Sequence, residues 1–234
     1  MRSKTLIFTA TYNESENIKI FIQQIFDQNL DADLLIIDDN SPDKTWLEIE
    51  KFKKKFQKLF LIKREKKLGL DTAHKLAFDY AKKNSYNFLI TLDADLSHDP
   101  NKIINFIEEL RINPFVIGSR YIKGGKSEMA IHRYLLSFFG NKLIKFILNI
   151  ESNEFTTSFR GFDLKKLENF DINKVSSKGY SFFMETIFLI NKLGFNIKQI
   201  PIEFKHRHEG SSKIPKIEIF RTLKNLFLLK FFKK

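Results

Sequence analysis

Apolar and polar positions follow two different periods along the first part of the chain. Short runs of β-prone apolar residues predict strands, and the segments between them, in which apolar residues recur every three to four positions, predict amphipathic helices. The predicted strands are Thr5–Ala10, Leu34–Ile37, Leu59–Lys63, Phe88–Leu92 and Phe115–Gly118. The predicted helices between them are Glu16–Gln28, Thr45–Lys55, Leu70–Lys83 and Lys102–Leu110. This alternation predicts an α/β fold with a mainly parallel sheet flanked by helices.

Beyond Gly118 the pattern changes to two long apolar segments that basic residues punctuate. Tyr134–Ile150 is broken only by two asparagines and two lysines, which fits a core helix and a membrane-surface helix equally well. Ile217–Lys234 sets Phe, Leu and Ile against Arg and Lys at a chain end, where little core remains to cover it. This second segment favours a basic amphipathic helix at a membrane interface.

These patterns predict one α/β domain over residues 1–213, followed by a basic amphipathic tail over residues 214–234. The Leu6–Phe8 run is far too short for the core of a signal peptide. No stretch approaches the roughly 18 uninterrupted apolar residues that a membrane span requires. We therefore expect neither a signal peptide nor a transmembrane helix.

The composition narrows the classes of chemistry and partner. The absence of cysteine excludes disulfides, thiolate metal sites and cysteine nucleophiles, and it fits a reducing compartment. Lys and Arg outnumber Asp and Glu by 40 to 28, and such a surplus favours nucleic acid, anionic lipid or phosphorylated substrates as partners. Because Lys, Ile, Asn and Phe are all abundant, genome base composition explains the same surplus, and charge alone selects no function.

The most informative stretch is Phe88–Pro100, in which an apolar strand ends in two carboxylates, Asp93 and Asp95. Residues i and i+2 at a strand end point the same way, so these like charges project together and a cation relieves their repulsion. Oxygen donors without cysteine or an adjacent histidine pair suit Mg²⁺ or Mn²⁺, which share their remaining positions with phosphates. The alternative is a turn in which Asp93 is a cap and Asp99 begins the next helix.

Acidic residues also follow the first two strands, at Asn13-Glu14 and Asp38-Asp39. Ligand sites in such sheets lie beyond the carboxyl ends of the strands. Three acidic strand ends that meet at one edge favour a ligand site over a set of solvated loops.

Taken together, the chain resembles the family 2 glycosyltransferases of GT-A fold, and within them the dolichol- and polyprenol-phosphate mannosyltransferases. Eight segments carry the resemblance, in the family's order and over nearly the whole chain. They are Ala10–Asn17, Ile37–Asp43, Lys67–Ala73, Asp93–Pro100, Gly118–Tyr121, Ser158–Phe162, Lys178–Tyr180 with Met184-Glu185, and Arg207–Lys213. The chain departs from the family where Ala10 replaces a common Pro and where Asp71 replaces a usual Gly near the donor site.

The resemblance implies a Rossmann-like, mixed but mainly parallel sheet with a nucleotide-sugar donor across its carboxyl edge. The positions that match those holding the base and ribose are Tyr12, Glu14, Asp38 and Asp39. The positions that match the metal site, for Mg²⁺ or Mn²⁺ on the donor diphosphate, are Asp95, Asp93 and Ser97. The resemblance does not distinguish GDP-mannose from UDP-glucose.

The resemblance also implies an anionic acceptor. The positions that match those around the acceptor phosphate are Arg120, Arg133, Arg207, Ser212 and Lys213. Guanidinium groups suit phosphate oxygens, and Gly210 lets the backbone approach one. A phosphate acceptor is already anionic at neutral pH and needs orienting more than a base. A hydroxyl acceptor needs a base, for which Glu185 is the candidate, and its alternative role is to bond backbone near the acceptor mouth.

These inferences predict an inverting, metal-dependent hexosyltransferase that acts on a polyprenyl or dolichyl monophosphate. Inversion follows from a single in-line displacement of the nucleotide. We expect a peripheral protein on the cytoplasmic face of a membrane, bound to the bilayer or to an integral-membrane partner. Two alternatives stay open: a family 2 transferase that acts on a hydroxyl of a surface glycan, and a non-catalytic basic module that binds membrane or nucleic acid. Nucleic acid is not expected as a partner, because the acidic edge repels its phosphates.

Overall fold

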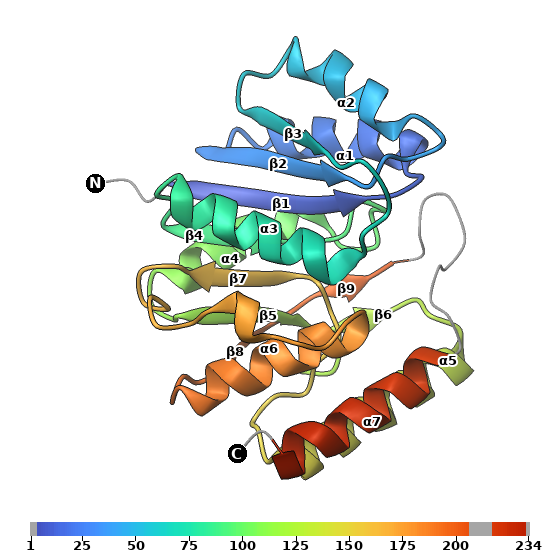
Figure 1. Cartoon of the computed structure of the whole chain (residues 1–234), viewed down its shortest axis with the longest axis vertical. Coiled ribbons are helices and arrows are strands. Elements are labelled where there is room, and N and C mark those ends of the chain that lie inside the picture. Colours follow the sequence, from blue (N-terminus) through green and yellow to red (C-terminus); the bar gives the residue numbers. More distant parts are fainter. Residues whose placement is uncertain (1–3, 206–216, 233–234) are drawn as a thin grey trace.

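A computed structural model describes residues 4–205 and 217–232 of the chain, with side chains of the last helix given from Phe220 onward. The main sheet has seven strands in the order β3-β2-β1-β4-β7-β5-β8 (Figure 1). Its strands are β1 (Thr5–Thr11), β2 (Ala32–Asp38), β3 (Leu59–Lys63), β4 (Phe88–Thr91), β5 (Phe115–Ser119), β7 (Arg160–Asp163) and β8 (Lys198–Pro201). A second sheet pairs the short strands β6 (Lys126–Ser127) and β9 (Glu203–Phe204).

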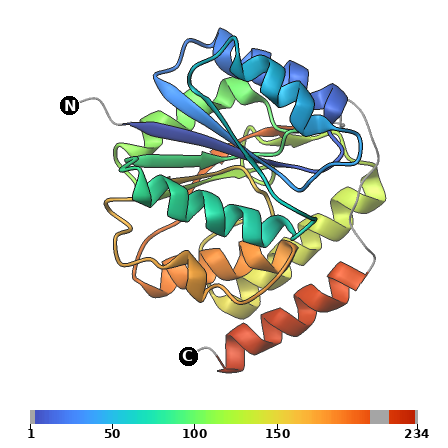
Figure 2. The same cartoon turned by 45° about the horizontal axis from the view of Figure 1, so that its top comes forward.

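Helices cover both faces of the main sheet (Figure 2). They are α1 (Ser15–Asp27), α2 (Thr45–Lys53), α3 (Leu70–Lys83), α4 (Ile103–Leu110), α5 (Ile131–Leu148), α6 (Tyr180–Lys192) and α7 (Ile217–Phe232), with 3₁₀ turns η1 (Pro100–Lys102) and η2 (Ile172–Lys174). The predicted α/β class with a mixed, mainly parallel sheet and a C-terminal helix is therefore confirmed. The apolar pattern did not predict β7, α6 and β8, nor the short strands β6 and β9.

Alternation along the strands divides the apolar residues into two layers. On one face, Leu6 and Phe8 of β1 pack with Phe78 of α3 and with residues of α6. On the other face, Ile7 packs with Phe21 and the other apolar residues of α1, and with α4. Since both faces are covered, the central strands are buried throughout, which explains their continuous apolar runs.

Strand β7 is antiparallel to both of its neighbours, β4 and β5, whereas β1 to β4 are parallel to one another along the order β3-β2-β1-β4. Gly161 at its centre lies opposite Ile90 on one side and Val116 on the other. A Cβ atom there would come within 2.9 Å of the Leu110 side chain, so the glycine lets α4 lie directly on the sheet. The parallel strands β1 to β4 bring their carboxyl ends, with the loops that follow, to one edge.

Helices α5 and α7 lie side by side at the end of the molecule that β8 borders (Figures 1 and 2). Ile144 and Leu148 of α5 and Leu226 and Leu229 of α7 are buried in the core layer that also contains α6. One face of α5 therefore belongs to the core, and its opposite face is exposed, so the membrane-surface alternative stays a prediction for that face. In residues 4–205 and 217–232, no helix is both long and apolar enough to cross a bilayer.

Candidate active site

Asp38, at the carboxyl end of β2, is completely buried. Its carboxylate accepts hydrogen bonds from the Thr11 hydroxyl at 2.8 Å, from the Ser41 amide at 2.9 Å and from the Ser41 hydroxyl at 2.6 Å. These bonds hold the loop after β2 against the end of β1. The structure therefore places the predicted donor residue Asp38 beneath the edge of the sheet, where it supports the loops above it.

Asp39, the next residue, is buried and holds the loop between β3 and α3. Its Oδ1 pairs with both Nε and Nη2 of Arg64. Its Oδ2 accepts hydrogen bonds from the amides of Leu68 at 3.1 Å and Gly69 at 3.2 Å. A carboxylate offers about four lone-pair positions, so the protein occupies all of those of Asp39.

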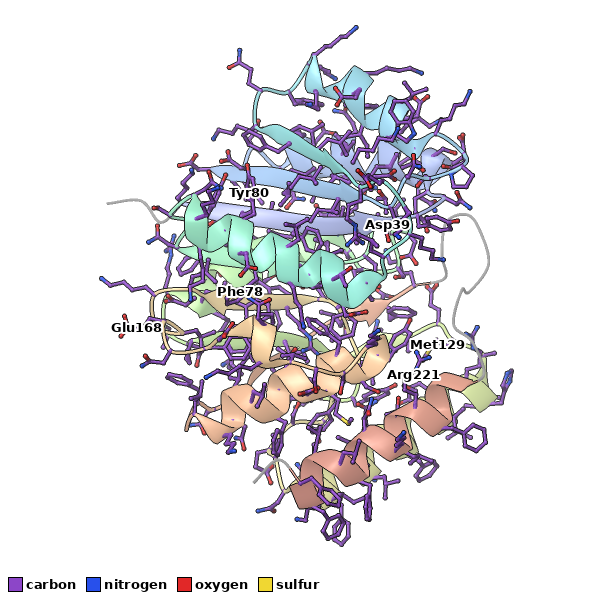
Figure 3. All side chains as sticks on the ribbon, viewed as in Figure 1. Asp39, Phe78, Tyr80, Met129, Glu168 and Arg221 are labelled. Carbon is purple, nitrogen blue, oxygen red and sulfur yellow. The ribbon has the colours of Figure 1, made fainter. Side chains whose placement is uncertain are left out.

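Tyr12 and Glu14 lie in the loop after β1, next to these aspartates. The Nζ atom of Lys67 stands 4.0 Å from the centre of the Tyr12 ring. The Glu14 carboxylate accepts a hydrogen bond from the Asn17 amide nitrogen at 2.7 Å, and its backbone amide donates to Thr45. The predicted donor residues are therefore brought together at one edge, and Figure 3 shows Asp39 at the end of the sheet where β1 finishes.

Asp93 and Asp95, the acidic pair predicted to hold a divalent cation, follow β4 at the same edge. Asp95 is 4% exposed, and its Oδ1 accepts hydrogen bonds from the Ser97 amide at 3.1 Å and the Ser97 hydroxyl at 2.6 Å. The Asp93 side chain is 38% exposed. Ser97, predicted as a third ligand, thus supports Asp95 through its hydroxyl hydrogen.

The oxygen donors of this pair fit Mg²⁺ or Mn²⁺. Within the described residues, no cluster of three or more His, Cys, Asp or Glu side chains is placed to hold a metal ion. Mg²⁺ is commonly bound through one or two carboxylates together with substrate phosphates. The residues present therefore fit a cation that is shared with a phosphate-bearing ligand.

His98 is a buried residue of the same loop whose role the sequence did not indicate. Its Nδ1 lies 3.7 Å from the Asp93 carboxylate, and its Nε2 lies 3.1 Å from the Thr157 hydroxyl. Burial lowers the pKa of His98 below its ordinary value of 6.5, although the charges of Asp93 and Asp95 act in the opposite direction. A neutral imidazole therefore joins the loop after β4 to the loop that precedes β7.

Arg120, predicted to contact an acceptor phosphate, forms a buried ion pair with Glu154. Its Nε and Nη2 donate to the two carboxylate oxygens at 2.8 and 2.9 Å, and Nη2 also lies 3.3 Å from the Thr156 hydroxyl. Burial alone lowers the pKa of Arg120 and raises that of Glu154, but the opposite charges and hydrogen bonds outweigh it. The pKa of Arg120 is therefore raised, that of Glu154 is lowered, and both groups are charged.

The remaining nitrogen of Arg120, Nη1, points to the Met129 sulfur at 3.9 Å, just before the start of α5. A thioether is a weak acceptor, so the hydrogens of Nη1 are the ones this guanidinium can offer to an anion. Arg133, the other predicted phosphate residue among those described, is exposed in the first turn of α5. Figure 3 shows Met129 on the same side of the molecule as Asp39.

Glu185 is fully buried within α6, and its side chain meets the loop that precedes this helix. Its carboxylate accepts hydrogen bonds from the Ser176 amide at 3.1 Å, the Ser177 amide at 2.7 Å and the Ser176 hydroxyl at 3.3 Å. This geometry matches its alternative role as a residue that bonds backbone. Arg207, Ser212 and Lys213 lie outside the described residues.

Sequence reasoning missed the partners of the predicted residues. Arg64 and Glu154 are more than twenty positions along the chain from Asp39 and Arg120, the residues with which they pair. His98 lies within the Asp93–Pro100 motif, but its contact with Thr157 depends on a loop distant in sequence. The segment Lys63–Lys67 carries an obvious basic signal, but its reach to Tyr12 depends on how the loop folds.

Comparisons with known proteins identify the family. A family model described as Glycosyl transferase family 2 matches residues 6–170. The polyprenol monophosphomannose synthase of Mycolicibacterium smegmatis is 30% identical over 214 residues, which are 90% of this chain and 81% of that protein. The undecaprenyl-phosphate mannosyltransferase of Micrococcus luteus is 31% identical over 215 residues, which are 92% of this chain and 88% of that protein.

Solved structures share the fold at low sequence identity. The glucosyl-3-phosphoglycerate synthase of Mycobacterium tuberculosis, in complex with Mn²⁺, UDP and phosphoglyceric acid, has a TM-score of 0.66 at 15% identity, over 97% of this chain and 78% of that one. A mannosyltransferase of Pyrobaculum calidifontis, in complex with GDP-Man and Mn²⁺, has a TM-score of 0.59 at 15% identity, over 92% of this chain. The chain spans 58% of the length of that second structure.

Proposed function

The chain belongs to glycosyl transferase family 2 and is a glycosyltransferase, and on that premise we propose that it transfers a hexose from a nucleotide sugar to a polyprenyl or dolichyl monophosphate. One observation carries the proposal most directly. Asp95 is held almost out of solvent by Ser97 at the carboxyl edge, beside the half-exposed Asp93 and next to the loop of Tyr12. Two relatives that are 30% and 31% identical to this chain are named for mannose and for polyprenyl phosphates, which supports mannose as the hexose.

The donor lies across the ends of β1, β2 and β4 in this proposal. Tyr12 and Glu14 border its nucleoside, and Asp38 and Asp39 hold the loops that form the floor beneath it. Asp93 and Asp95 would hold a Mg²⁺ or Mn²⁺ ion, which when bound neutralises charge that builds on the departing diphosphate. The Mn²⁺ complexes of proteins with this fold support a divalent cation without distinguishing the two metals.

The acceptor phosphate lies near the start of α5. Arg120 is fixed by Glu154 through two of its nitrogens, so its third nitrogen is presented without the entropy cost of a free side chain. Arg133 belongs to this anion-binding subsite in the proposal, and the resemblance assigns Arg207, Ser212 and Lys213, which lie outside the described residues, to the same role. Because the phosphate is already anionic, one of its oxygens attacks the anomeric carbon opposite the departing nucleotide, which inverts the configuration.

The hydrogen bonds of Glu185 support a phosphate acceptor over a hydroxyl acceptor. A general base must accept a proton from the nucleophile, and it needs oxygen positions free to do so. Two backbone amides and a hydroxyl already donate to the two oxygens of Glu185. Its position within the core, with no exposed surface, also keeps it from an acceptor.

Helices α5 and α7 supply the contact with a bilayer in this proposal. Of the nineteen large apolar side chains exposed in the described part of the chain, twelve lie on these two helices. Exposed apolar clusters on this scale are typical of protein or membrane contacts. They are accompanied by basic residues, which anionic lipid attracts. These basic residues are Arg133, Lys142, Lys145, Arg221, Lys224 and Lys230.

This surface supports a position at a membrane, and the cytoplasmic leaflet is the one whose anionic lipids match its charge. The absence of cysteine is consistent with that compartment. Residues 1–213 then form the catalytic domain and residues 214–234 the interfacial tail, with α7 packed on α5 and α6.

The test is a transfer assay with purified protein, polyprenyl phosphate in detergent, Mg²⁺ or Mn²⁺, and labelled GDP-mannose, UDP-glucose or UDP-N-acetylglucosamine. Label that enters an acid-labile lipid product, and does not do so in the presence of chelator, supports the proposal. Metal-dependent hydrolysis of the donor without lipid product would move the acceptor to a glycan hydroxyl. Neither signal, together with salt-sensitive and metal-independent membrane or nucleic-acid binding, would favour a non-catalytic module.

A further inference from the structure

The loop that follows β3 is held unusually firmly for an exposed segment. Besides the four contacts of Asp39, the Arg64 amide donates to the Asp38 carbonyl at 2.8 Å, and the side chain of Asn40 donates to the Glu65 carbonyl at 2.9 Å. Arg64 also donates through Nη1 to the Thr72 hydroxyl at 2.6 Å. Gly69 ends the loop with φ at +97°, a conformation that glycine adopts without strain. The loop is therefore fixed in place before any ligand arrives.

Lys67 is the residue that this fixed loop presents to the site. Its side chain reaches back from the end of β3 to the end of β1, where Nζ lies over the Tyr12 ring at 4.0 Å. No carboxylate among the described residues pairs with it. A cation–π contact at an exposed site is worth about 0.5–1 kcal/mol, so a ligand with better acceptors readily takes the ammonium group over.

The strand order decides which part of a donor Lys67 meets. Along β4, β1, β2 and β3, the loops carry Asp95, then Tyr12, then Asp39, then Lys67. If the diphosphate lies at Asp95, as the proposed function has it, the nucleoside extends toward Tyr12 and the loop of Lys67. The inference that follows rests on that proposed function.

We propose that Lys67 and Tyr12 together recognise the base of the donor, and that Lys67 selects guanine. A base that stacks on the Tyr12 ring takes the place of the ammonium group, which then moves to the edge of that base. An ammonium group only donates hydrogen bonds. Guanine offers two adjacent acceptors, O6 and N7, whereas adenine places an amino group beside N7. Uracil offers isolated carbonyl oxygens, so guanine is the base that this lysine binds best.

Asp39 is a positioning residue in this scheme. All of its lone-pair positions are taken by Arg64 and by the amides of Leu68 and Gly69, so it acts on the base through the loop that carries Lys67. Its loss frees Lys67 from the position over Tyr12. The effect of Asp39 should therefore depend on the presence of Lys67.

The experiment is calorimetric titration of GDP, UDP and ADP into the protein with Mn²⁺ present. The wild type should bind GDP most tightly. Lys67→Met should weaken GDP binding about tenfold or more and change UDP and ADP binding by less than about twofold, because one base contact is lost. Lys66→Met is the matched control, since this exposed neighbour makes no hydrogen bond, ion pair or ring contact with any described residue. Lys63→Met is a second control, because it removes a lysine over Trp46, at 3.5 Å.

Each outcome of this titration decides a different question. GDP binding that Lys67→Met leaves unchanged, or an equal loss for all three nucleotides, would overturn base recognition by Lys67 while the proposed function stands. No metal-dependent binding of any nucleotide to the wild type would instead count against the proposed function.

A double-mutant cycle tests the positioning role of Asp39. Asp39→Asn should weaken GDP binding by a similar factor, and Asp39→Asn combined with Lys67→Met should be no weaker than the Lys67→Met variant alone. Additive losses would mean that Asp39 acts independently of Lys67 and would overturn this part of the proposal. Far-ultraviolet circular dichroism of each variant, recorded before titration, separates loss of fold from loss of binding.

Discussion

The carboxyl edge of the sheet and the paired helices α5 and α7 differ in whether their side chains find partners within the protein. At the edge, Asp38, Asp39 and Asp95 each accept hydrogen bonds from nearby loops, so the polar groups are in place without a ligand. On α5 and α7, side chains such as Phe139 and Phe146 are 60% and 83% exposed. The edge is organised from within the protein, whereas the exposed faces of α5 and α7 would be stabilised by contact with another apolar surface.

Arg120 connects these two regions. Glu154 holds it as the loops hold the aspartates, yet its remaining nitrogen points to Met129 at the start of α5. A lipid phosphate that enters from the α5 side would therefore meet a group that is already oriented. Under the proposed function, Arg120 would orient the headgroup and the exposed faces of α5 and α7 would leave the rest of the lipid in the membrane.

The largest effect on activity should come from replacing Asp95 at the carboxyl edge of the sheet. Asp95→Asn should lower sugar transfer by at least about a thousandfold, because a neutral amide does not hold the cation at the diphosphate. The measurement is initial rate at saturating donor. Asp99→Asn is the control, since the Asp99 carboxylate only caps the turn at Asn101. Retention of more than a tenth of the activity by the Asp95 variant would contradict the metal assignment.

Removal of Glu154 tests the group that joins the two regions. Glu154→Gln leaves the buried Arg120 charge without its partner, and we expect the free energy of unfolding to fall by about 3 kcal/mol in urea titrations. Glu151→Gln is the matched control, because Glu151 belongs to the exposed pair with Lys145 and should cost less than about 1 kcal/mol. Equal stability of the two variants would show that the buried pair does not hold the loop.

The same pair predicts a pH dependence with a definite sign. Arg120 and the hydrogen bonds lower the pKa of Glu154 below its ordinary value of 4.5, against the opposing effect of burial. The stabilisation is therefore complete above pH 4.5 and is lost as the pH falls through the lower pKa of the folded state. Wild type and Glu154→Gln should differ in unfolding free energy at pH 7 and converge as the pH falls below 4.5. A constant difference would refute this linkage.

Loss of exposed apolar side chains from α5 should weaken membrane binding and leave the free energy of unfolding unchanged. Phe139→Ser combined with Phe146→Ser should weaken partition onto vesicles of phosphatidylcholine and phosphatidylserine by about 2 kcal/mol, which is more than tenfold. The measurement is co-sedimentation with the vesicles. Ile112→Ser is the control, since Ile112 is 78% exposed but lies after α4. If both variants bind alike, α5 is not the membrane contact.

The smallest effect should come from the basic residues of α7. Lys224→Ser and Lys230→Ser, made singly, should each weaken binding to the same vesicles by about 1 kcal/mol at low salt, and by less as salt is added. Vesicles of phosphatidylcholine alone should show no difference. A loss that is independent of salt and of phosphatidylserine would mean that these lysines act through packing.

Strands β1, β2, β4 and β5 could be predicted because they are buried on both faces. Such strands read as apolar runs, and their ends were placed within two residues of those in the structure. Strand β7 could not be predicted in this way, because Arg160–Asp163 contains no apolar run. It is a strand because it lies between β4 and β5, and its buried Arg160 donates to the carbonyls of Phe155, Thr157 and Phe183.

For the candidate site, too, the positions set by buried strands could be predicted, and the contacts set by loops could not. That Glu14, Asp39 and Asp95 meet at one edge follows from strand ends and could be predicted. That Arg64 and two amides occupy Asp39, or that Glu154 holds Arg120, depends on loop conformations and on pairs distant in sequence. The roles of these residues toward donor and acceptor stay predictions until they are measured.

The antiparallel insertion of β7 has a consequence for how the chain folds as it leaves the ribosome. In the described sheet, β5 touches the β1–β4 half only through β7, although β5 is synthesised some forty residues earlier. Until residues 160–163 emerge, β5 has no neighbour in the nascent sheet, and its apolar Phe115–Ile117 edge is open to chaperones or to other chains. Attachment of β5 to the β1–β4 half of the sheet thus waits for one short strand, and slow translation before Arg160 would prolong that exposure.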